Sequence, residues 1–208
     1  MRVRAISCTP EAETTVVKIA RVSSTRQDLA AEAAGLLRYL IRNKHWSPFE
    51  HAHMTLEFTT SRAIATQLLR HRSFTFQEFS QRYASVRQLG RRPFEPVELR
   101  AQAASNRQSS SEALDDPDAQ RLLEQALDVA WDTYERLLER GVARECARFV
   151  LPLCTQTVVH MTGSARSWLH FFELRTDEHA QKEVRELALA ARTLFSAEFP
   201  VVAGVMGW

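Results

Sequence analysis

The sequence predicts an α+β fold in which helices dominate. Hydrophobic residues make up 45% of the 208 residues, which is enough for a sizeable core and argues against disorder. Most apolar patterns have a helical period, and the few strand-like segments need not be parallel. None of the six glycines lies in the Gly-rich loop of a Rossmann or P-loop phosphate site. The length suits one domain, or one domain with a small elaboration.

The chain begins with a predicted strand and two predicted helices. Residues 2–7 indicate the strand, and Pro10 favours a helix start soon after it. Residues 27–43 predict a longer amphipathic helix. The apolar stripe of the first helix comprises Val16, Val17, Ile19 and Ala20, and that of the second comprises Leu29, Ala33, Leu36, Leu37, Leu40 and Ile41.

A connection and a strand are predicted next. Residues 45–51 indicate the connection, because Pro48 disfavours helix at the residue before it. The strand is indicated by apolar residues that alternate with polar ones, which is typical of a half-buried strand. These residues are Met54, Leu56 and Phe58.

A third helix is expected to run from a cap at Ser61 to about Arg72. The phenylalanines that follow interrupt the helical pattern, so extended or irregular backbone is expected there. They are Phe74, Phe76 and Phe79. If residues 77–83 are extended, alternate side chains share one side of the strand.

The second half of the chain is mainly helical. Residues 102–116 are polar and serine-rich, and predict a mobile surface loop. Asp116 and Pro117 then open a long helix, by cap and first-turn proline, and Gly141 closes it. The remaining predicted elements are a short helix at 144–150, a strand at 154–162, a helix from a cap at Ser164 to Thr176, and a helix at 178–198 that stops before Pro200.

The charged residues and cysteines narrow the class of protein. The formal net charge is +2, which does not suggest a nucleic-acid coat protein. Arginine accounts for 24 of the 27 basic residues, and arginine binds phosphates and carboxylates with two parallel hydrogen bonds. The three cysteines show no pairing pattern, and the sequence shows neither a signal peptide nor an apolar run of membrane-spanning length. These features predict a soluble cytoplasmic protein without a membrane partner.

A polar constellation lies between residues 67 and 83. Arg70, His71 and Arg72 would point in three directions from a helix, with Gln67 on the face of Arg70. This is also what an ordinary helix end with dipole-favoured basic residues would look like. Glu78, Ser80 and Arg82 would share one side of an extended segment and suit a nucleoside monophosphate. A simple polar strand face explains that pattern equally well.

The segment Arg70-His71-Arg72, seven residues, and Ser80 resembles the signature of the flavin-dependent thymidylate synthases. Gln81-Arg82-Tyr83 continues the likeness. Three further segments resemble the family in the same order along the chain, which makes a chance match to one short motif improbable. They are His45 with Ser47-Pro48-Phe49-Glu50-His51; Arg144-Glu145, Ala147-Arg148 and Leu151-Pro152; and Ala165-Arg166-Ser167, Leu174-Arg175 and His179-Ala180-Gln181.

The resemblance implies one helix-rich domain over residues 1–208, with a small, mostly antiparallel sheet, that assembles as a homotetramer. It implies reductive methylation of dUMP at C5 to give dTMP. Methylenetetrahydrofolate would donate the one-carbon unit, and FAD reduced by NADPH would carry the hydride. No nucleic-acid partner is expected.

The resemblance also implies roles for individual residues. Arg175 would be catalytic, because a fixed cation favours the N3-deprotonated pyrimidine. Ser80 would bind substrate, since no neighbouring pattern marks a base that could activate it as a nucleophile. His45 and Tyr83 would lie near the flavin and the folate. The dUMP ligands would be Gln67, Arg70, Glu78, Ser80, Gln81, Arg82, Arg148 and Arg175. The FAD ligands would be Ser23, Ser47, Glu50, Arg70, His71, Arg72, Glu78, Ser164, Arg166, His170 and His179.

Three positions depart from the family pattern. Gln77, Ser164 and His170 stand where asparagine is common. Gln77 has the same side-chain amide group as asparagine. Ser164 and His170 change the reach of a hydrogen-bonding side chain at expected FAD contacts.

Two other functions remain open from the residues alone. A metal-dependent nucleotide hydrolase would use His45, His51 and His53 with Glu50, but three such ligands would have to converge. No metal is therefore expected. An arginine-rich nucleotide-binding module is the other alternative, and the near-neutral charge and Glu78 argue against it.

Overall fold

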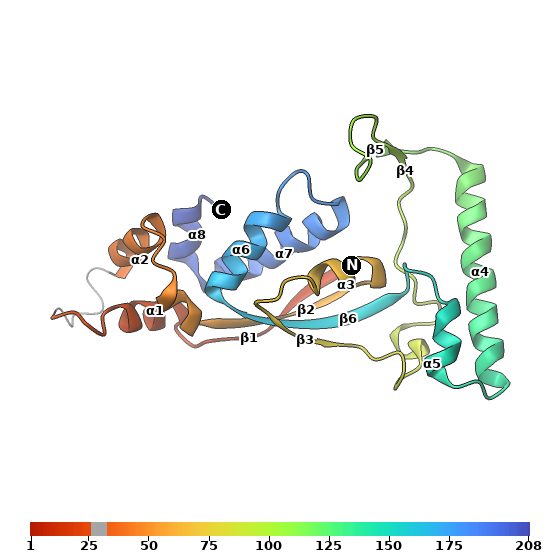
Figure 1. Cartoon of the computed structure of the whole chain (residues 1–208), viewed down its shortest axis with the longest axis horizontal. Coiled ribbons are helices and arrows are strands. Elements are labelled where there is room, and N and C mark those ends of the chain that lie inside the picture. The colour runs from red at the N-terminus through yellow and green to blue at the C-terminus, as the bar shows by residue number, and fades with distance from the viewer. Residues whose placement is uncertain (26–32) are drawn as a thin grey trace. The chain divides into compact units, whose positions relative to one another are not determined.

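The computed structural model describes residues 1–25 and 33–208, and its architecture confirms the predicted α+β class. About half of the chain is helical, and the sheet is small and antiparallel. Its four strands lie in the order β1-β2-β6-β3 (Figure 1). Their bounds are β1 Arg2–Cys8, β2 His53–Ser61, β6 Gln156–Ser164 and β3 Thr75–Glu78.

Backbone contacts divide the chain into two compact units. The α4 unit comprises Met1, Thr59–Thr66 and Glu78–Val158. The α6 unit comprises Arg2–Phe58, Gln67–Gln77 and Val159–Trp208. One domain over residues 1–208 stays a prediction.

The α6 unit holds most of the aromatic core. Helix α7 packs against β1 and against α6, and Figure 1 shows both helices on one side of the sheet. Residues three and four apart on α6 share a face, so Trp168, Phe171 and Phe172 are all fully buried together. The helices of this unit are α1 Ala12–Ala20, α2 Ala33–Arg42, the 3-10 helix η1 Ser47–His51, α6 Ala165–Arg175, α7 Lys182–Glu198 and α8 Pro200–Met206.

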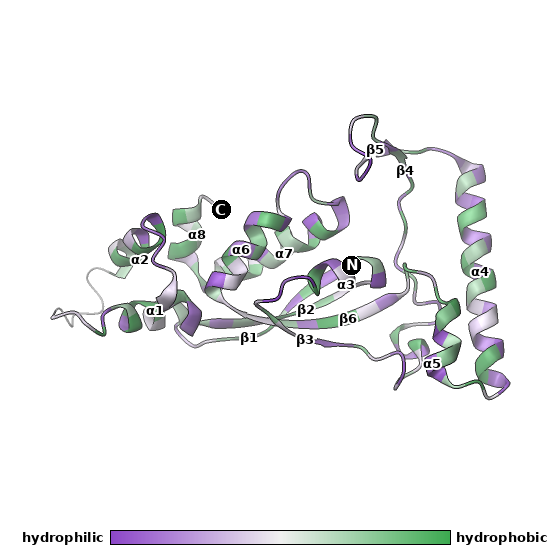
Figure 2. Cartoon of the chain, viewed as in Figure 1, coloured by the Kyte–Doolittle hydropathy of each residue, from purple (hydrophilic) through white to green (hydrophobic). Residues whose placement is uncertain are grey.

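The α4 unit is organised along one long amphipathic helix. Figure 2 shows hydrophobic and hydrophilic residues interspersed along α4. Its buried Tyr134 packs with Val86 and Ala147 in a second small core. The elements of this unit are η2 Val86–Leu89, β4 Arg100–Gln102, β5 Ser110–Ala113, α4 Pro117–Glu139, α5 Arg144–Ala147 and η3 Arg148–Val150. Helix α3, Arg62–Leu68, begins in this unit.

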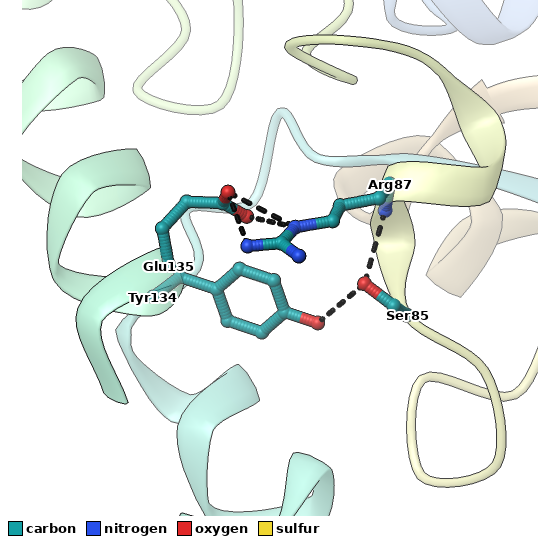
Figure 3. Close-up of polar contacts among 4 residues, drawn as sticks. All are labelled: Ser85, Arg87, Tyr134 and Glu135. Carbon is teal, nitrogen blue, oxygen red and sulfur yellow. Dashed lines mark hydrogen bonds and ion pairs between the residues drawn. The ribbon is translucent and has the colours of Figure 1, made fainter. Parts of the chain in front are cut away.

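Polar side-chain contacts connect α4 to η2 (Figure 3). The guanidinium of Arg87 donates from Nε to both carboxylate oxygens of Glu135, at 2.7 and 2.9 Å. Such fork-like pairs have a defined geometry as well as charge. The hydroxyls of Tyr134 and Ser85 lie 3.5 Å apart, and Ser85 also caps η2 by accepting from the Arg87 amide.

The predicted helix caps are confirmed. Asp116 Oδ1 accepts from the amides of Asp118 and Ala119 at 3.0 Å, which satisfies two of the free donors at the start of α4. Ser61 and Ser164 accept from the third residue beyond each of them. Gly141 follows α4 with φ of 80°, which glycine adopts without strain.

The backbone from residue 69 to residue 84 differs from the prediction. Helix α3 ends at Leu68, so residues 70–72 lie in a turn rather than at a helix end. The turn places His71 in a buried position. A continued helix would not have required His71 to be buried. The expectation of extended backbone over 77–83 is wrong beyond Glu78, because the amides of Tyr83 and Ala84 both donate to the Ser80 carbonyl. Serine favours such local turns.

Three other expectations are corrected. The predicted connection at 45–51 contains η1, whose start tolerates Pro48. The predicted loop at 102–116 contains β5, which pairs with β4 in the register Arg100↔Ala113 and Gln102↔Ser110. The last predicted helix begins at Lys182 rather than 178, and Pro200 starts α8, which was not predicted. Residues 27–32 of the predicted second helix, including Leu29, lie outside the described residues.

Gly163 on β6 sets a tight packing limit beside the aromatic core. A Cβ on Gly163 would overlap the ring of Phe74. Phe74 is buried, and its ring centroid lies 4.8 Å from that of Trp168. We expect Gly163→Ala to lower the free energy of unfolding by about 1–3 kcal/mol, as overpacking does. Gly35→Ala is the control, because open space surrounds Gly35 within α2 and alanine favours helix. Chemical denaturation of both variants measures the difference, and equal stabilities would contradict the prediction.

Candidate active site

The last residue of α6 reaches back to the turn that follows α3. Arg175 donates from Nε to His71 Nε2 at 2.9 Å, and from Nη2 to the Gln67 carbonyl at 3.4 Å. A guanidinium only donates, so His71 Nε2 must be an acceptor and the imidazole proton lies on Nδ1. The fold therefore joins two segments that are about a hundred residues apart in the chain.

His71 is held as a neutral imidazole. Its side chain is 8% exposed and makes edge-to-face contacts with Phe74 and Phe171. Burial, together with the nearby charges of Arg175 and His170, lowers the pKa of His71 to about 4. At neutral pH the ring therefore accepts a hydrogen bond without adding charge.

The positive charge of Arg70 acts on the Arg175 guanidinium. Burial first, and then the charge of Arg70, lower the pKa of Arg175 below its ordinary value. Neither arginine forms an ion pair with an acidic residue in the part of the chain that the structure describes. Paired cations without a counterion form a favourable environment for an anionic ligand.

A second group of predicted site residues is centred on Glu50, in η1. Its carboxylate accepts from Ser164 Oγ at 2.5 Å and from Arg166 Nη1 at 2.8 Å. Burial opposes ionisation here, but the hydrogen bonds from Ser164 and Arg166 outweigh it and lower the pKa of Glu50. Ser164 thus donates a hydrogen bond to Glu50 from a position where asparagine is common in the family pattern. It also caps α6.

Glu50 and Arg166 lie on the wall of a cavity of about 820 Å³ in the α6 unit. Cofactor pockets commonly have volumes of roughly 300–1,000 Å³ and mostly apolar walls with a few polar groups. This cavity has that composition, so the residues present fit a ring-containing cofactor. Its lining is Ile41, Lys44, Trp46, Glu50, Ser73, Arg166, Ser167, Leu169, His170, Phe172, Glu173, Thr176, Met206 and Trp208.

In the α4 unit, Glu78 is held by two donors. Its Oε1 accepts from Arg62 Nη1 at 2.5 Å and from Thr157 Oγ1 at 2.9 Å. Arg62 was not among the predicted site residues, and no motif in the sequence signals its pairing with Glu78. These contacts orient the carboxylate, and its second oxygen has no hydrogen-bond partner among the described residues.

Two arginines expected among the dUMP ligands, Arg82 and Arg148, both contact Glu145. Arg82 pairs with the Glu145 carboxylate at 3.1 Å, and Arg148 Nε donates to the Glu145 carbonyl at 3.3 Å. Ser80 is exposed, whereas Gln81 is buried with its side-chain Nε2 unpaired among the described residues. Arg82 and Glu145 also line a cavity of about 560 Å³ in the α4 unit.

The remaining predicted residues are mostly exposed. Arg72, Ser23, Ser47 and His45 lie at the surface, and Tyr83 is 86% exposed. His179 is also exposed, and its hydrogen bond with Asp177 raises its pKa. Within each unit the structure thus assembles part of the predicted set. Gln67, Arg70 and Arg175 belong to the α6 unit, and Glu78, Ser80, Gln81, Arg82 and Arg148 belong to the α4 unit.

The described residues can be compared with the ligand set that a metal-dependent hydrolase would need. No group of three or more histidine, cysteine or acidic side chains is arranged to hold a metal ion in residues 1–25 and 33–208. His51 belongs to η1 and His53 begins β2, so the two histidines do not lie on one strand. Among the helices described, none is long and apolar enough to cross a membrane.

The chain is similar in sequence and in fold to nucleotide-methylating enzymes. A family model described as thymidylate synthase complementing protein, Thy1, matches residues 4–201. A probable flavin-dependent thymidylate synthase of Paramecium bursaria Chlorella virus 1 is 45% identical and covers 95% of this chain and 91% of its own length. The flavin-dependent thymidylate synthase of Synechocystis is 47% identical over 91% of this chain and 86% of its own.

A solved structure agrees with the sequence relatives. The UMP/dUMP methylase PolB of Streptomyces cacaoi, bound with 5-Br dUMP, superposes with a TM-score of 0.86. The two chains are 32% identical, and the match covers 99% of this chain and 94% of PolB. The chain is therefore an enzyme, and it belongs to the flavin-dependent thymidylate synthase family.

Proposed function

We propose that this enzyme converts dUMP to dTMP by reductive methylation at C5. Methylenetetrahydrofolate would donate the one-carbon unit, and FAD reduced by NADPH would carry the hydride. The observation that carries the proposal is the Arg175 guanidinium, held by His71 and Gln67 beside Arg70 without an acidic partner among the described residues. The names of the relatives and the nucleotide bound to PolB support it.

Arg175 would act on the pyrimidine. Two of its five N–H donors are used within the protein, which leaves three for the substrate. A fixed cation next to N3 favours the deprotonated ring, because opposite charges at short range favour the ionised form. Deprotonation raises the electron density of the ring and makes C5 a better nucleophile.

Glu50, Arg166 and His170 would hold FAD at the cavity of the α6 unit. The carboxylate and guanidinium are already oriented by their mutual hydrogen bond, so little ordering remains for binding. When bound, FAD would supply the hydride that completes the methyl group. Ser80 would bind substrate, since its Oγ accepts from the Tyr83 amide and no activating base contacts it among the described residues.

The proposed assembly is a homotetramer located in the cytoplasm. The substrate-directed residues are divided between two units of the chain, and the family resemblance implies sites built by several subunits. Light scattering of the flavin-saturated protein tests the assembly. A monomer under those conditions would contradict it.

The decisive experiment is formation of dTMP from dUMP by the purified protein. The complete mixture contains FAD, NADPH and methylenetetrahydrofolate, and each is omitted in turn. We expect product only in the complete mixture, with a smaller amount without added FAD if flavin co-purifies. A colourless protein that gains no flavin absorbance with FAD and forms no dTMP would refute the proposal.

Arg70 offers a second test, because it is expected to contact both dUMP and FAD. Arg70→Ala should weaken the binding of each ligand about tenfold, which corresponds to one lost charge-assisted hydrogen bond. Fluorescence titration with FAD and calorimetric titration with dUMP measure the two affinities. Unchanged affinity for both ligands would show that Arg70 serves neither.

A further inference from the structure

We propose that His71 is the positioning residue of Arg175. The inference rests on the proposed function in one respect, which is that Arg175 acts on the substrate. The contact between the two side chains is observed independently of that function.

The hydrogen bond from Arg175 to His71 sets the plane of the guanidinium. A guanidinium is planar, so fixing Nε against His71 and Nη2 against the Gln67 carbonyl defines the direction of every other N–H. Without the Nε contact, the longer bond of 3.4 Å to Gln67 would be the one hydrogen bond left to Arg175 among the described residues. The side chain could then rotate about its flexible stem.

His71 is itself rigidly held. Its amide donates to the Leu68 carbonyl and its carbonyl accepts from the Phe74 amide, both at 3.1 Å. The ring centroid lies 5.0 Å from that of Phe171 in an edge-to-face contact. Rotating the imidazole would displace these buried aromatic rings. With Nε2 occupied by Arg175, the Nδ1–H donor is the part of the ring that remains for another partner.

The chemistry of histidine suits this position. Arg70 repels Arg175, so the Arg175 guanidinium needs an acceptor to keep it in place. A carboxylate would supply one, but it would also neutralise the positive charge that the substrate requires. A neutral imidazole accepts the same hydrogen bond and leaves the charge of Arg175 intact.

Two variants separate positioning from packing. His71→Phe keeps an aromatic ring of similar size but has no acceptor, and His71→Gln places an amide oxygen near the position of Nε2. We expect kcat to fall about ten- to a hundredfold in His71→Phe, with the Kd for FAD changed less than threefold. His71→Gln should recover most of kcat. Melting temperatures of both variants verify that they are folded.

A double-mutant cycle links the effect to Arg175. If His71 acts through Arg175, adding His71→Phe to Arg175→Ala should lower activity no further than Arg175→Ala alone. Additive losses would overturn the inference. Equal activity of His71→Phe and the wild type would also overturn it, as would a tenfold loss of FAD affinity in both His71 variants.

A spectroscopic measurement keeps the inference testable whatever the reaction is. The Arg175 Nε–H resonance of 15N-labelled protein, assigned by its absence from Arg175→Lys, should be protected from solvent exchange. Protection should be lost in His71→Phe and retained in His71→Gln. An unprotected resonance in the wild type would contradict the positioning role. Absence of dTMP formation by a wild type with a protected resonance would contradict only the proposed function.

Discussion

Arg175→Ala is expected to lower the rate of dTMP formation at least about a hundredfold while the protein still binds FAD. Removing a single preorganised electrostatic contact to a transition state commonly costs that much. Arg175 meets this description because His71 and Gln67 orient it, and no acidic residue of the described chain neutralises it. Steady-state dTMP assays and flavin fluorescence titrations on the same preparation measure the two properties.

Two control variants define what the loss means. Arg136→Ala removes an exposed arginine from α4 that pairs only with Asp132 among the described residues, so activity should be unchanged. Arg175→Lys keeps the positive charge but loses the planar fork, and should recover only part of the activity. Normal turnover by Arg175→Ala would refute the catalytic role.

Glu50→Ala is expected to weaken FAD binding by about tenfold or more. The carboxylate organises Ser164 and Arg166 at the wall of the α6-unit cavity, and hydrogen bonds that involve charged groups are the stronger ones. Its removal would leave Arg166 without its acceptor and remove one polar contact from the wall. Equilibrium titration with FAD, followed by the quenching of flavin fluorescence, measures the change.

Glu135→Ala is the matched control for Glu50→Ala. Glu135 also forms a close ion pair with an arginine, Arg87, but it lies in the α4 unit and does not line the α6-unit cavity (Figure 3). We expect lower stability without a change in the Kd for FAD. If both variants lose FAD affinity equally, the effect comes from general destabilisation and Glu50 is not a specific ligand.

Local signals in the sequence predicted the elements whose formation depends on neighbouring residues. The cap at Asp116 with Pro117 located the start of α4, and the alternation of Met54, Leu56 and Phe58 located β2. These predictions succeed because a cap or an alternating pattern acts within a few residues. The pairing of β4 with β5 was missed, because a polar, serine-rich segment lacks the apolar alternation that indicates a strand.

The candidate site likewise has features that the sequence predicted and features that it did not. The spacing of Arg70-His71-Arg72 and Ser80, with the segments around Glu50, Arg148 and Arg175, indicates the family from sequence alone. Nothing in the spacing indicated that His71 would be buried against Phe171 or that Arg62 would pair with Glu78. Both contacts depend on how distant segments pack.

By itself, the sequence determined the family and the α+β class, since residue type and short-range spacing carry that information. It also predicted which residues would contact a nucleotide or a flavin. Only the tertiary structure decided that α3 stops at Leu68 and that the chain turns at Ser80. It also decided that Arg175 contacts His71, which lies about a hundred residues earlier in the chain. The physical reason is burial. The free energy gained by placing His71 and Phe74 against the aromatic core comes from residues far away in the chain, and it overrides the local preference for helix.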